Sequence, residues 1–454
     1  MSPVRDPAGF SAAARAARWE ALGREPLDLL VVGGGITGTG IALDAAGRGL
    51  RTALVEAGDF AEGTSSRSSR LVHGGLRYLQ TGDFRLVFEA LSERRRLLRL
   101  APHLVRPLPF LFPLFRGGPV GFRKLQAGMW AYDALSLFRG VRRHRMLRPA
   151  AVAEAEPGLR AEGLAGAALY HDASVDDARL TLAVARTAAE AGAELVTHAE
   201  VTGFLREGDG IGGARVRDRL GGGTREVRAR VVVNATGPWC DALRRLADPG
   251  VRPRLRPTKG VHVVLRRERV GNAGAIIFPS PLDGRIMFVL PWGAFTYLGT
   301  TDTDYDGSPA AASAEGADVE YLLESVNALY PGARLAAADV LSTWTGVRPL
   351  LAPRAEGGGI TESATPREHE IWRDRSGLVS VAGGKLTTYR VMAAQAVDFV
   401  ARVLGREREL ASFRAFTEEL SLAGAPADPW DAFLERIRAE AVRLGLGEAT
   451  GTHL

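Results

Sequence analysis

The sequence is poor in cysteine and in lysine, and each shortage narrows the possibilities. Cys240 is the single cysteine among 454 residues, so the chain cannot form an internal disulfide. A chain without disulfides is typical of a reducing compartment, and a lone thiol with no motif around it is expected in the core. Of the 58 basic residues only Lys124, Lys259 and Lys385 are lysines. Because arginine cannot replace a compact, titratable ammonium, these three positions are candidates for special roles.

Long apolar runs are missing as well. No stretch approaches the ~18–20 consecutive apolar residues that a membrane-spanning helix needs. Residues 1–30 carry four acidic side chains and no apolar signal-peptide core, and they predict a short amphipathic helix that leads into a strand. We therefore expect a cytoplasmic protein, with peripheral attachment to the cytoplasmic face of the inner membrane as an alternative.

The clearest motif is a nucleotide-binding unit in residues 28–56. An apolar strand at 28–32 runs into three glycines with GxGxxG spacing, and a helix at 36–48 and a second strand at 52–56 follow. Such glycines permit a tight turn, close approach of the backbone to a pyrophosphate and close helix–strand packing. The helix N-terminus then offers free amides to the phosphates. The predicted cofactor contacts in this unit are Gly33, Gly35, Ile36, Thr37, Gly38 and Glu56.

Glu56 narrows the choice of nucleotide. It ends the second strand, where a carboxylate accepts a hydrogen bond from the adenosine ribose. An acid at this place disfavours the 2′-phosphate of NADP but does not distinguish NAD from FAD.

The rest of the chain does not continue as a simple alternation of strands and helices. Its length predicts two or three domains. We predict a helix over 84–100, a helix and strand over 180–202, a buried strand and Gly-Pro turn over 229–239, an antiparallel sheet over 254–301, and a strand, glycine turn and long helix over 377–404. This order indicates an α/β protein whose nucleotide domain is discontinuous, with a second domain inserted between its segments.

Residues 63–79, "GTSSRSSRLVHGGLRYL", crowd serines, arginines and one histidine together without the period of a helix or strand. This segment and six further motifs resemble the FAD-dependent glycerol-3-phosphate dehydrogenases, a branch of the glutathione-reductase-like flavoproteins related to D-amino acid oxidase. The resemblance extends from about Pro26 to Leu404. The motif "GGGITGTGIALDAAGRGL" precedes that segment in the chain. The motifs "NATGPW", "PTKGVHVV", "GTTDTDYDG", "TGVRPL" and "GGKLTTYR" follow it in this order.

The resemblance implies a domain plan. It predicts a discontinuous Rossmann-like FAD-binding domain at 26–100, 166–242 and 340–404, and a substrate-binding domain with a mixed or antiparallel sheet at 101–165 and 243–339. The family carries a longer helical C-terminal domain than residues 405–454 supply, so we expect a truncated helical segment there.

The resemblance also implies site residues. In addition to the residues of the nucleotide-binding unit, the implied cofactor contacts are Thr64, Ser65, Ser66, Ser69, His73, Gly74, Gly75, Gly237, Gly384, Lys385, Leu386 and Thr387. The implied substrate contacts are Arg77, Tyr78, Arg348, Arg367 and Lys385, with Arg348 and Lys385 also counted as catalytic. Guanidinium and ammonium donors suit a phosphate dianion. No metal site is expected.

The implied reaction is oxidation of sn-glycerol 3-phosphate to dihydroxyacetone phosphate with non-covalently bound FAD, with electrons passed to quinone. An imidazole suits the removal of the hydroxyl proton, because its usual pKa lies near working pH. We favour His262 as this base, with His73 as the rival. Alternatives are an amino-acid or amine oxidase of the same fold and a truncated, inactive FAD-binding protein. A homodimer is also compatible with the resemblance.

Residues 122–148 are basic and partly apolar. Nine Arg or Lys and one acid occur between Leu104 and Ala153, and tryptophan, phenylalanine, leucine and methionine alternate with them. This composition suits an amphipathic helix that binds anionic lipid. A quinone reductase without a membrane span needs such a surface to reach its lipid-soluble acceptor. The alternative is a helix that packs its apolar side inside the protein. Nucleic acid is not an expected partner, because no recognition motif accompanies the charge.

Overall fold

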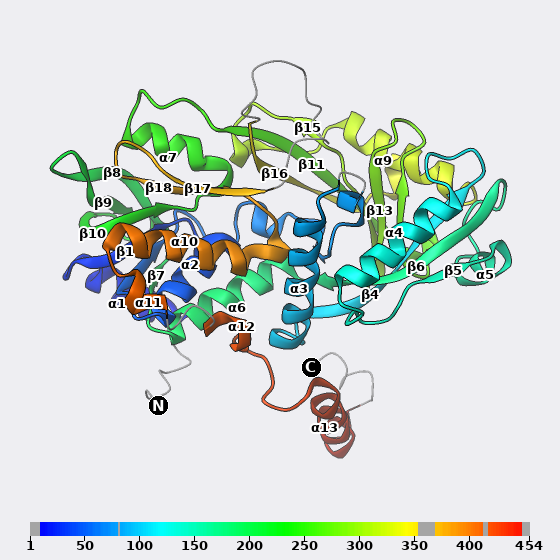
Figure 1. The fold of residues 1–454 in the computed structure, drawn as a ribbon, viewed down its shortest axis with the longest axis horizontal. Helices are drawn as coiled ribbons and strands as arrows, with labels where there is room; N and C mark the ends of the chain where they lie inside the picture. The colour runs from blue at the N-terminus through cyan, green and yellow to red at the C-terminus, as the bar shows by residue number, and fades with distance from the viewer. Residues whose placement is uncertain (1–9, 80–81, 353–367, 412–415, 447–454) are drawn as a thin grey trace.

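The computed structural model describes residues 10–79, 82–352, 368–411 and 416–446. Two sheets form its frame: Figure 1 shows the first toward the left and the second toward the centre and right. The first sheet has the order β17-β18-β10-β1-β2-β7, with β9 on β10 and β8 on β9. Its strands are β1 (Leu27–Val32), β2 (Thr52–Val55), β7 (Glu194–Val196), β8 (Ala199–Glu207), β9 (Gly210–Asp218), β10 (Thr224–Asn234), β17 (His369–Arg373) and β18 (Val379–Gly383).

The centre of this sheet is parallel and buried on both faces. β1 pairs in parallel with β2 and β10, and β10 with β18. Leu29 and Val31 of β1 join a core with helices α2, α6 and α10, while Leu30 and Val32 join a second core with Trp19 on the other face. The helices are α1 (Ala12–Ala21), α2 (Ile36–Gly47), α6 (Asp177–Glu190) and α10 (Tyr389–Leu404). The predicted strand–glycine–helix–strand unit and the N-terminal helix are therefore confirmed.

The second sheet has ten strands in the order β15-β11-β14-β13-β12-β4-β6-β3, with β16 on β11 and β5 on β6. The antiparallel pairing predicted for residues 254–301 is confirmed for β11, β14, β13 and β12, whereas β12 pairs in parallel with β4. The strands are β3 (Leu71–Val72), β4 (Val105–Phe115), β5 (Arg145–Leu147), β6 (Leu164–Val175), β11 (Leu255–Arg266), β12 (Ala275–Pro279), β13 (Ile286–Trp292), β14 (Phe295–Gly299), β15 (Thr303–Asp304) and β16 (Ser342–Leu351).

The sheets cut across three of the predicted domain segments. β3, β6 and β16 all belong to the ten-stranded sheet, although 26–100, 166–242 and 340–404 are predicted to form the FAD-binding domain. β6 pairs with β4 and β16 pairs with β11, which are strands of the predicted substrate-binding segments, and such long-range pairing leaves no mark in the local sequence. The domain boundaries themselves stay a prediction.

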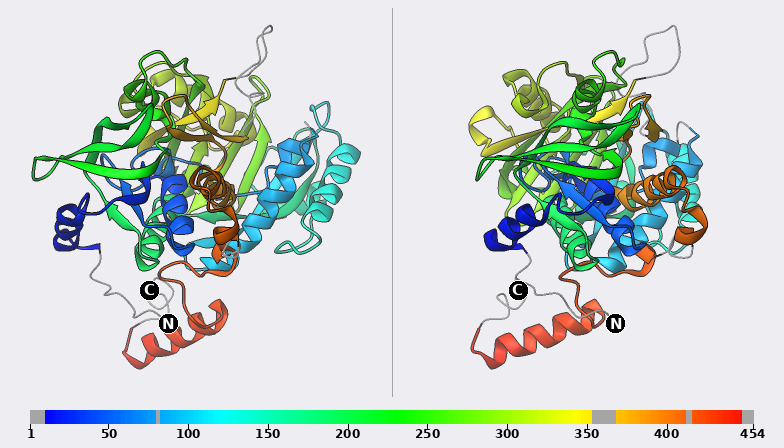
Figure 2. Two further views of the ribbon diagram at one scale, coloured as in Figure 1. Left: turned by 60° about the vertical axis from the view of Figure 1, so that its left-hand side comes forward. Right: turned by 90° about the vertical axis from the view of Figure 1, so that its left-hand side faces the viewer.

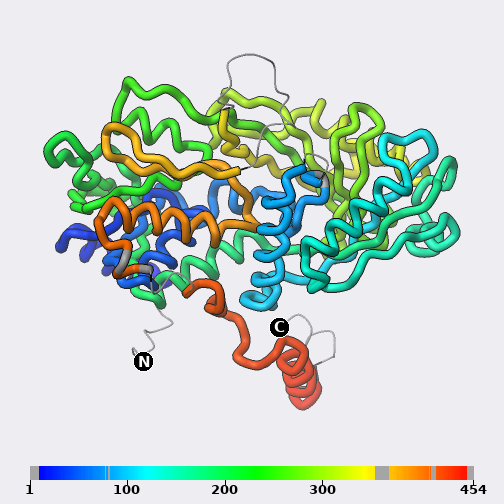
Figure 3. Tube along the Cα trace, in the orientation of Figure 1, coloured from blue at the N-terminus to red at the C-terminus, as the bar shows by residue number. Residues whose placement is uncertain are grey.

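Helices from opposite ends of the chain meet on the first sheet: Figure 3 shows α2 in blue and α10 in orange side by side. In Figure 2 the last helix stands apart from the body in both views. The other described helices are α3 (Phe84–Leu100), α4 (Phe122–Leu135), α5 (Pro149–Ala155), α7 (Cys240–Ala247), α8 (Arg267–Val270), α9 (Gly316–Leu329), α11 (Glu407–Ala411), α12 (Phe416–Glu419) and α13 (Trp430–Arg443).

Two predictions from the composition can be checked directly. Cys240 is fully buried at the start of α7, and burial raises the pKa of its thiol to about 12, so it is a core residue as expected. Among the described residues, no helix combines the length and the apolar character that crossing a bilayer requires.

Candidate active site

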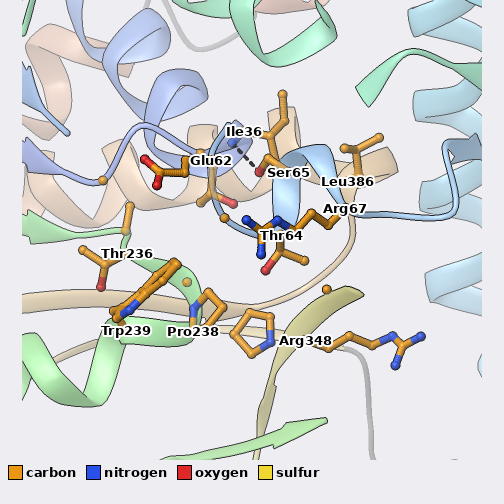
Figure 4. A pocket seen from close by; sticks show the side chains of 18 of the residues that line it. Ile36, Glu62, Thr64, Ser65, Arg67, Thr236, Pro238, Trp239, Arg348 and Leu386 are labelled. Carbon is orange, nitrogen blue, oxygen red and sulfur yellow. Dashed lines mark hydrogen bonds between the residues drawn. The ribbon is translucent and has the colours of Figure 1, made fainter. Parts of the chain in front are cut away.

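One cavity of about 800 Å³ lies where the carboxyl ends of β1, β2 and β10 face β11 and β16. In Figure 4, Thr236 and Trp239 lie at one side of it and Arg348 at the other, with the segment from Thr64 to Arg67 between them. Most predicted site residues line it, namely Gly33, Gly35, Ile36, Thr37, Glu56, Thr64, Ser65, Ser69, His73, Tyr78, Gly237, His262, Arg348, Gly384, Lys385, Leu386 and Thr387. Among the described residues, the predicted contacts Gly38, Ser66, Gly74 and Gly75 do not line it.

The glycine turn after β1 is as tight as the motif predicts. Gly33 has φ +112°, and a Cβ there would lie 2.6 Å from the carbonyl oxygen of Ala235. A Cβ on Gly38 would strike the backbone of Gly33, so this glycine serves the packing of helix on strand. The amide of Ile36 at the start of α2 donates to Ser65 Oγ at 2.9 Å, the bond drawn in Figure 4. The N-terminus of α2 therefore lies at the cavity wall, where Ile36 and Thr37 line it.

Glu56 lies at the end of β2 with its carboxylate beside the glycine turn. It accepts hydrogen bonds from the amides of Gly34 at 2.5 Å and Gly58 at 2.8 Å. Burial raises the pKa of its carboxyl group, while these two bonds oppose the shift. Gly34 is needed here, because a Cβ would lie 2.9 Å from the side chain of Glu56. The carboxylate is thus fixed in the place where a ribose contact is predicted.

The serine-rich segment rests directly on the ten-stranded sheet. Thr64 Oγ1 donates to the carbonyl of Val347 at 2.6 Å. A Cβ on Gly346 would lie 2.6 Å from the carbonyl oxygen of Arg67, so glycine in "TGVRPL" allows two backbones to approach. This contact brings the segment next to Arg348, two residues further along β16.

Several serines in this segment bind the protein itself. Ser68 donates through its amide and its hydroxyl to Asp177 Oδ2, at 3.0 and 2.7 Å. The carbonyl of Ser68 accepts from Trp344 Nε1 at 3.2 Å, and the carbonyl of Ser69 accepts from Tyr297 OH at 2.9 Å. These bonds fix the path of the segment on one side of the cavity.

His262 is on β11 and is 2% exposed. Its Nε2 lies 2.8 Å from Ser69 Oγ, and its ring stacks on Trp344 with centroids 4.7 Å apart. Burial, followed by the charges of Arg348 and Arg70, lowers the pKa of His262 to about 3. The imidazole is therefore neutral over the whole working range of pH.

The His73–Gly75 segment is held from behind by a buried polar network. The amide of Gly74 donates to Tyr132 OH at 3.0 Å, and this hydroxyl donates to Asp172 at 2.8 Å. Asp172 also forms a very short ion pair with Arg94. Each of the three side chains is at least 97% buried, since their exposed fractions are 3%, 2% and 3%. Such a network of buried, mutually bonded side chains fixes local geometry, because breaking one of its bonds would leave a buried polar group without its partner.

The cationic residues differ in their surroundings. Arg348 donates to Asp302 Oδ1 and to Thr300 Oγ1, each at 2.9 Å, and a Cβ on Gly260 would lie in contact with its guanidinium. Lys385 Nζ lies 3.7 Å from the ring centroid of Tyr78. Arg367 lies outside the described residues, as does the side chain of Arg77.

The other two lysines lie elsewhere. Lys259 is buried and binds Glu315 and Asp318, each at 2.9 Å, so it ties α9 to β11 and does not line the cavity. Lys124 lies on α4. Of the three lysines only Lys385 is at the site. At the same end of the cavity, the amide of His73 donates to Thr387 Oγ1 at 3.3 Å.

Sequence reasoning missed several residues that shape this site. They are Arg94, Tyr132, Asp172, Tyr297, Asp302 and Trp344. Asp302 and Trp344 stand inside or beside quoted motifs, so strand alternation could have placed Trp344 on the face of Gly346 and Arg348. The others lie in segments with no motif, and nothing local marks them.

The cavity suits an FAD: glycines without room for a Cβ, a helix N-terminus and a fixed carboxylate lie along one wall. The profile of the FAD dependent oxidoreductase family matches residues 28–411. The chain belongs to this family. It is 45% identical to a glycerol-3-phosphate dehydrogenase of Mycobacterium leprae over 97% of this chain and 73% of that protein. An aerobic glycerol-3-phosphate dehydrogenase of Staphylococcus aureus is 38% identical over 95% of this chain and 78% of its own length.

Solved structures agree with this assignment. The glycerol-3-phosphate dehydrogenase from Bacillus halodurans complexed with FAD superposes with a TM-score of 0.79 at 36% identity, over 97% of this chain and 77% of that one. Glycine oxidase from Geobacillus kaustophilus shares the fold at a TM-score of 0.62 and 23% identity, over 83% of this chain and 95% of its own. The predictions of fold class, of an FAD-dependent enzyme and of FAD as cofactor are confirmed.

Proposed function

We propose that this enzyme oxidises sn-glycerol 3-phosphate to dihydroxyacetone phosphate. The observation that carries the proposal is the guanidinium of Arg348 at the end of the cavity opposite Thr236 and Trp239. A guanidinium at this place suits an anionic substrate, whether a phosphate ester or a carboxylate, and opposes a simple amine. Relatives that the chain matches over most of its length are named glycerol-3-phosphate dehydrogenases. FAD, when bound, supplies the acceptor for the hydride of the substrate.

The chain's own residues divide the remaining tasks. The wall from Gly33 to Ile36, with Glu56 and Ser65, would hold the adenosine and pyrophosphate parts of FAD. Gly237 and the turn from Gly384 to Thr387 would hold its other half. Arg348 would bind the phosphate of the substrate, together with Lys385, which lies over Tyr78. Asp302 fixes the orientation of Arg348 through a 2.9 Å bond.

An imidazole would accept the hydroxyl proton. His73 is the stronger candidate on physical grounds, because it lines the cavity on the segment that the Tyr132 network holds in place. His262, favoured on sequence, is a weak base with a pKa near 3, and its Nε2 is engaged with Ser69. Binding of an anionic phosphate to Arg348 would remove only one of the causes that lower this pKa.

Anaerobic titration tests the proposed function. The purified flavoprotein is mixed with sn-glycerol 3-phosphate under argon, and the flavin absorbance is followed. We expect full bleaching with a hyperbolic dependence on substrate, and no bleaching at the same concentrations with glycerol, glycine or proline. A flavin that an amino acid bleaches and glycerol 3-phosphate does not would replace this proposal with an amine or amino-acid oxidase.

We further propose that the electrons pass to a membrane quinone and that the enzyme docks on the cytoplasmic face of the membrane. α4 buries Leu125 and Met129, so the alternative of internal packing holds for one side of this helix. Elsewhere, α4 and the following loop leave Phe122, Trp130, Leu137 and Phe138 between 41% and 53% exposed.

Helix α3, which packs against α4, carries two more exposed aromatic side chains. Phe84 and Phe88 are 53% and 42% exposed and lie one helical turn apart. Basic residues accompany them on the α4 side, namely Arg123, Lys124, Arg139, Arg142, Arg143 and Arg145. Exposed aromatic rings with arginines around them suit the headgroup region of an anionic bilayer.

A further inference from the structure

His262 and Ser69 form a polar pair in the wall of the cavity. Ser69 belongs to the serine-rich segment and His262 to β11, yet Oγ and Nε2 are 2.8 Å apart and both residues line the cavity. The pair lies beside Arg348: Gly260, whose Cβ position touches the Arg348 guanidinium, precedes His262 by two residues on the same face of β11. Two residues of a strand span about 7 Å. One three-carbon phosphate ester can therefore reach both Arg348 and the pair.

The imidazole ring is fixed in orientation. Trp344 stacks on one face with an angle of 12° between the planes, and Tyr297 approaches at a centroid distance of 6.1 Å. Glycine at 299 leaves just enough room for the ring, because a Cβ there would collide with it. Trp344 and Tyr297 also bind the carbonyls of Ser68 and Ser69, so the same two side chains hold both members of the pair.

The buried Nδ1 atom identifies the tautomer. His262 Nδ1 makes no hydrogen bond to any residue that the structure describes. If Nδ1 carried the proton, its buried N–H would have no acceptor, which disfavours this tautomer by ~5- to 150-fold. A bare lone pair on Nδ1 is tolerated better. The proton therefore belongs on Nε2, which donates to Ser69 Oγ. The hydroxyl proton of Ser69 cannot then point back at His262 and is available to an acceptor in the cavity.

We propose that Ser69 is a catalytic residue whose hydroxyl donates a hydrogen bond to the C2 oxygen of the substrate, and that His262 is a positioning residue which acts through Ser69. The proposal rests on the proposed function. Ser69 keeps its own proton throughout, and the proton of the substrate hydroxyl goes to another base, for which His73 is the candidate. The donor chain from His262 through Ser69 stabilises negative charge that develops on the C2 oxygen, as an oxyanion hole does.

The charges around His262 support this division of roles. A proton on Nδ1 would place a third positive charge beside Arg348 of β16 and Arg70 of the serine-rich segment. Tyr297 of β14 faces the ring with a phenol whose own pKa is raised by burial, so it supplies no compensating negative charge. The surroundings therefore suit a neutral donor and oppose an imidazolium.

Three variants separate a donor from a base. His262→Gln keeps an N–H donor and cannot accept the proton, His262→Phe keeps a ring and has no donor, and Ser69→Ala removes the hydroxyl. We expect a loss of kcat of about 10²- to 10³-fold for His262→Phe and for Ser69→Ala, no further loss when both are combined, and a loss of at most about tenfold for His262→Gln. Flavin content and thermal unfolding of each variant control for folding. If His262→Gln is as slow as His262→Phe, His262 takes the proton itself and the proposal is overturned.

A measurement on the wild-type protein gives an independent readout. ¹⁵N-histidine NMR, with the His262 signals assigned by difference from His262→Gln, reports which ring nitrogen carries the proton. We expect a protonated Nε2 and a bare Nδ1 that do not titrate between pH 5 and 9, and a protonated Nδ1 or a titrating ring would overturn the proposal. Failure of glycerol 3-phosphate to bleach the wild-type flavin would overturn the proposed function and the Ser69 role together. An active wild type with equally slow Gln and Phe variants would overturn this inference alone.

Discussion

Replacing Arg348 with alanine should weaken substrate binding without emptying the cofactor site. The guanidinium has Asp302 on Nη1 and Thr300 on Nη2, and it lies over the glycine at 260, so its position is fixed before substrate arrives. A charge-assisted hydrogen bond contributes ~1.5–3 kcal/mol, which corresponds to a rise in KM of ~10- to 150-fold for the loss of one phosphate contact. In Figure 4, Arg348 lies away from Ile36 and Glu62 of the predicted nucleotide side, so flavin content should stay unchanged.

The assay is steady-state reduction of a dye acceptor over a range of glycerol 3-phosphate concentrations. Arg348→Lys is the matched control, because it keeps the charge and loses the planar fork, and its KM should lie between those of the wild type and Arg348→Ala. Asp302→Asn should raise KM by less than Arg348→Ala does, since it disturbs the orientation of the guanidinium and leaves its charge. A KM for Arg348→Ala equal to that of the wild type, with normal kcat, would remove Arg348 from the substrate site.

Three further predictions concern other parts of the molecule. In flotation at low salt, the wild type should rise with anionic liposomes and not with neutral ones, and Arg142→Glu/Arg143→Glu should lose this binding. The control Arg228→Glu/Arg230→Glu, which changes an exposed pair on β10, should keep the binding. Equal flotation of all three proteins, or flotation of none, would contradict the proposed docking face. Tyr132→Phe should lower the free energy of unfolding by ~1–3 kcal/mol and weaken FAD retention, because Asp172 and the Gly74 amide lose a partner; unchanged stability and flavin affinity would refute this role. Burial raises the pKa of Asp44 to about 6, so the folded state binds the carboxyl proton more tightly than the unfolded state does. The stability that the neutral carboxyl contributes is therefore lost as pH rises from 3.8 through 6. Asp44→Asn should remove this fall in stability, measured by calorimetry, and an identical pH dependence of stability in the two proteins would contradict the prediction.

The parts of the fold that follow from local pattern were predictable. The helix expected at 84–100 is α3 with the same bounds, and the strand–glycine–helix unit could be read from residue spacing, because its contacts lie within about thirty residues of one another. The network behind Gly74 was not predictable. Tyr132 is 58 residues from Gly74 and Asp172 is 98 residues from it, and neither stands in a motif. Their proximity is a result of how the ten-stranded sheet pairs.

The contrast between local pattern and long-range contacts also applies to the serines of the serine-rich segment. The family resemblance implied hydroxyl contacts to the cofactor from this segment, and Ser65 does lie at the N-terminus of α2. Ser68, however, binds Asp177 of α6, and Ser69 binds His262 of β11, 193 residues away. A local pattern identifies polar groups, but only the tertiary structure shows which of them have partners within the protein.

The parallel order β2-β1-β10-β18 has a consequence for synthesis on the ribosome. The three neighbours β1, β10 and β18 begin at Leu27, Thr224 and Val379, so the sheet edge that lines the cavity is complete only when most of the chain has left the ribosome. At ~5–20 residues per second, the interval between Val32 and Val379 lasts ~20–70 s. For roughly the first half of that time the apolar strand β1 lacks its partner β10, and β2 lacks β7 until Glu194–Val196 has been made. The nascent chain is therefore expected to need chaperone protection over this period, and its cofactor can be captured only after β18 has been made.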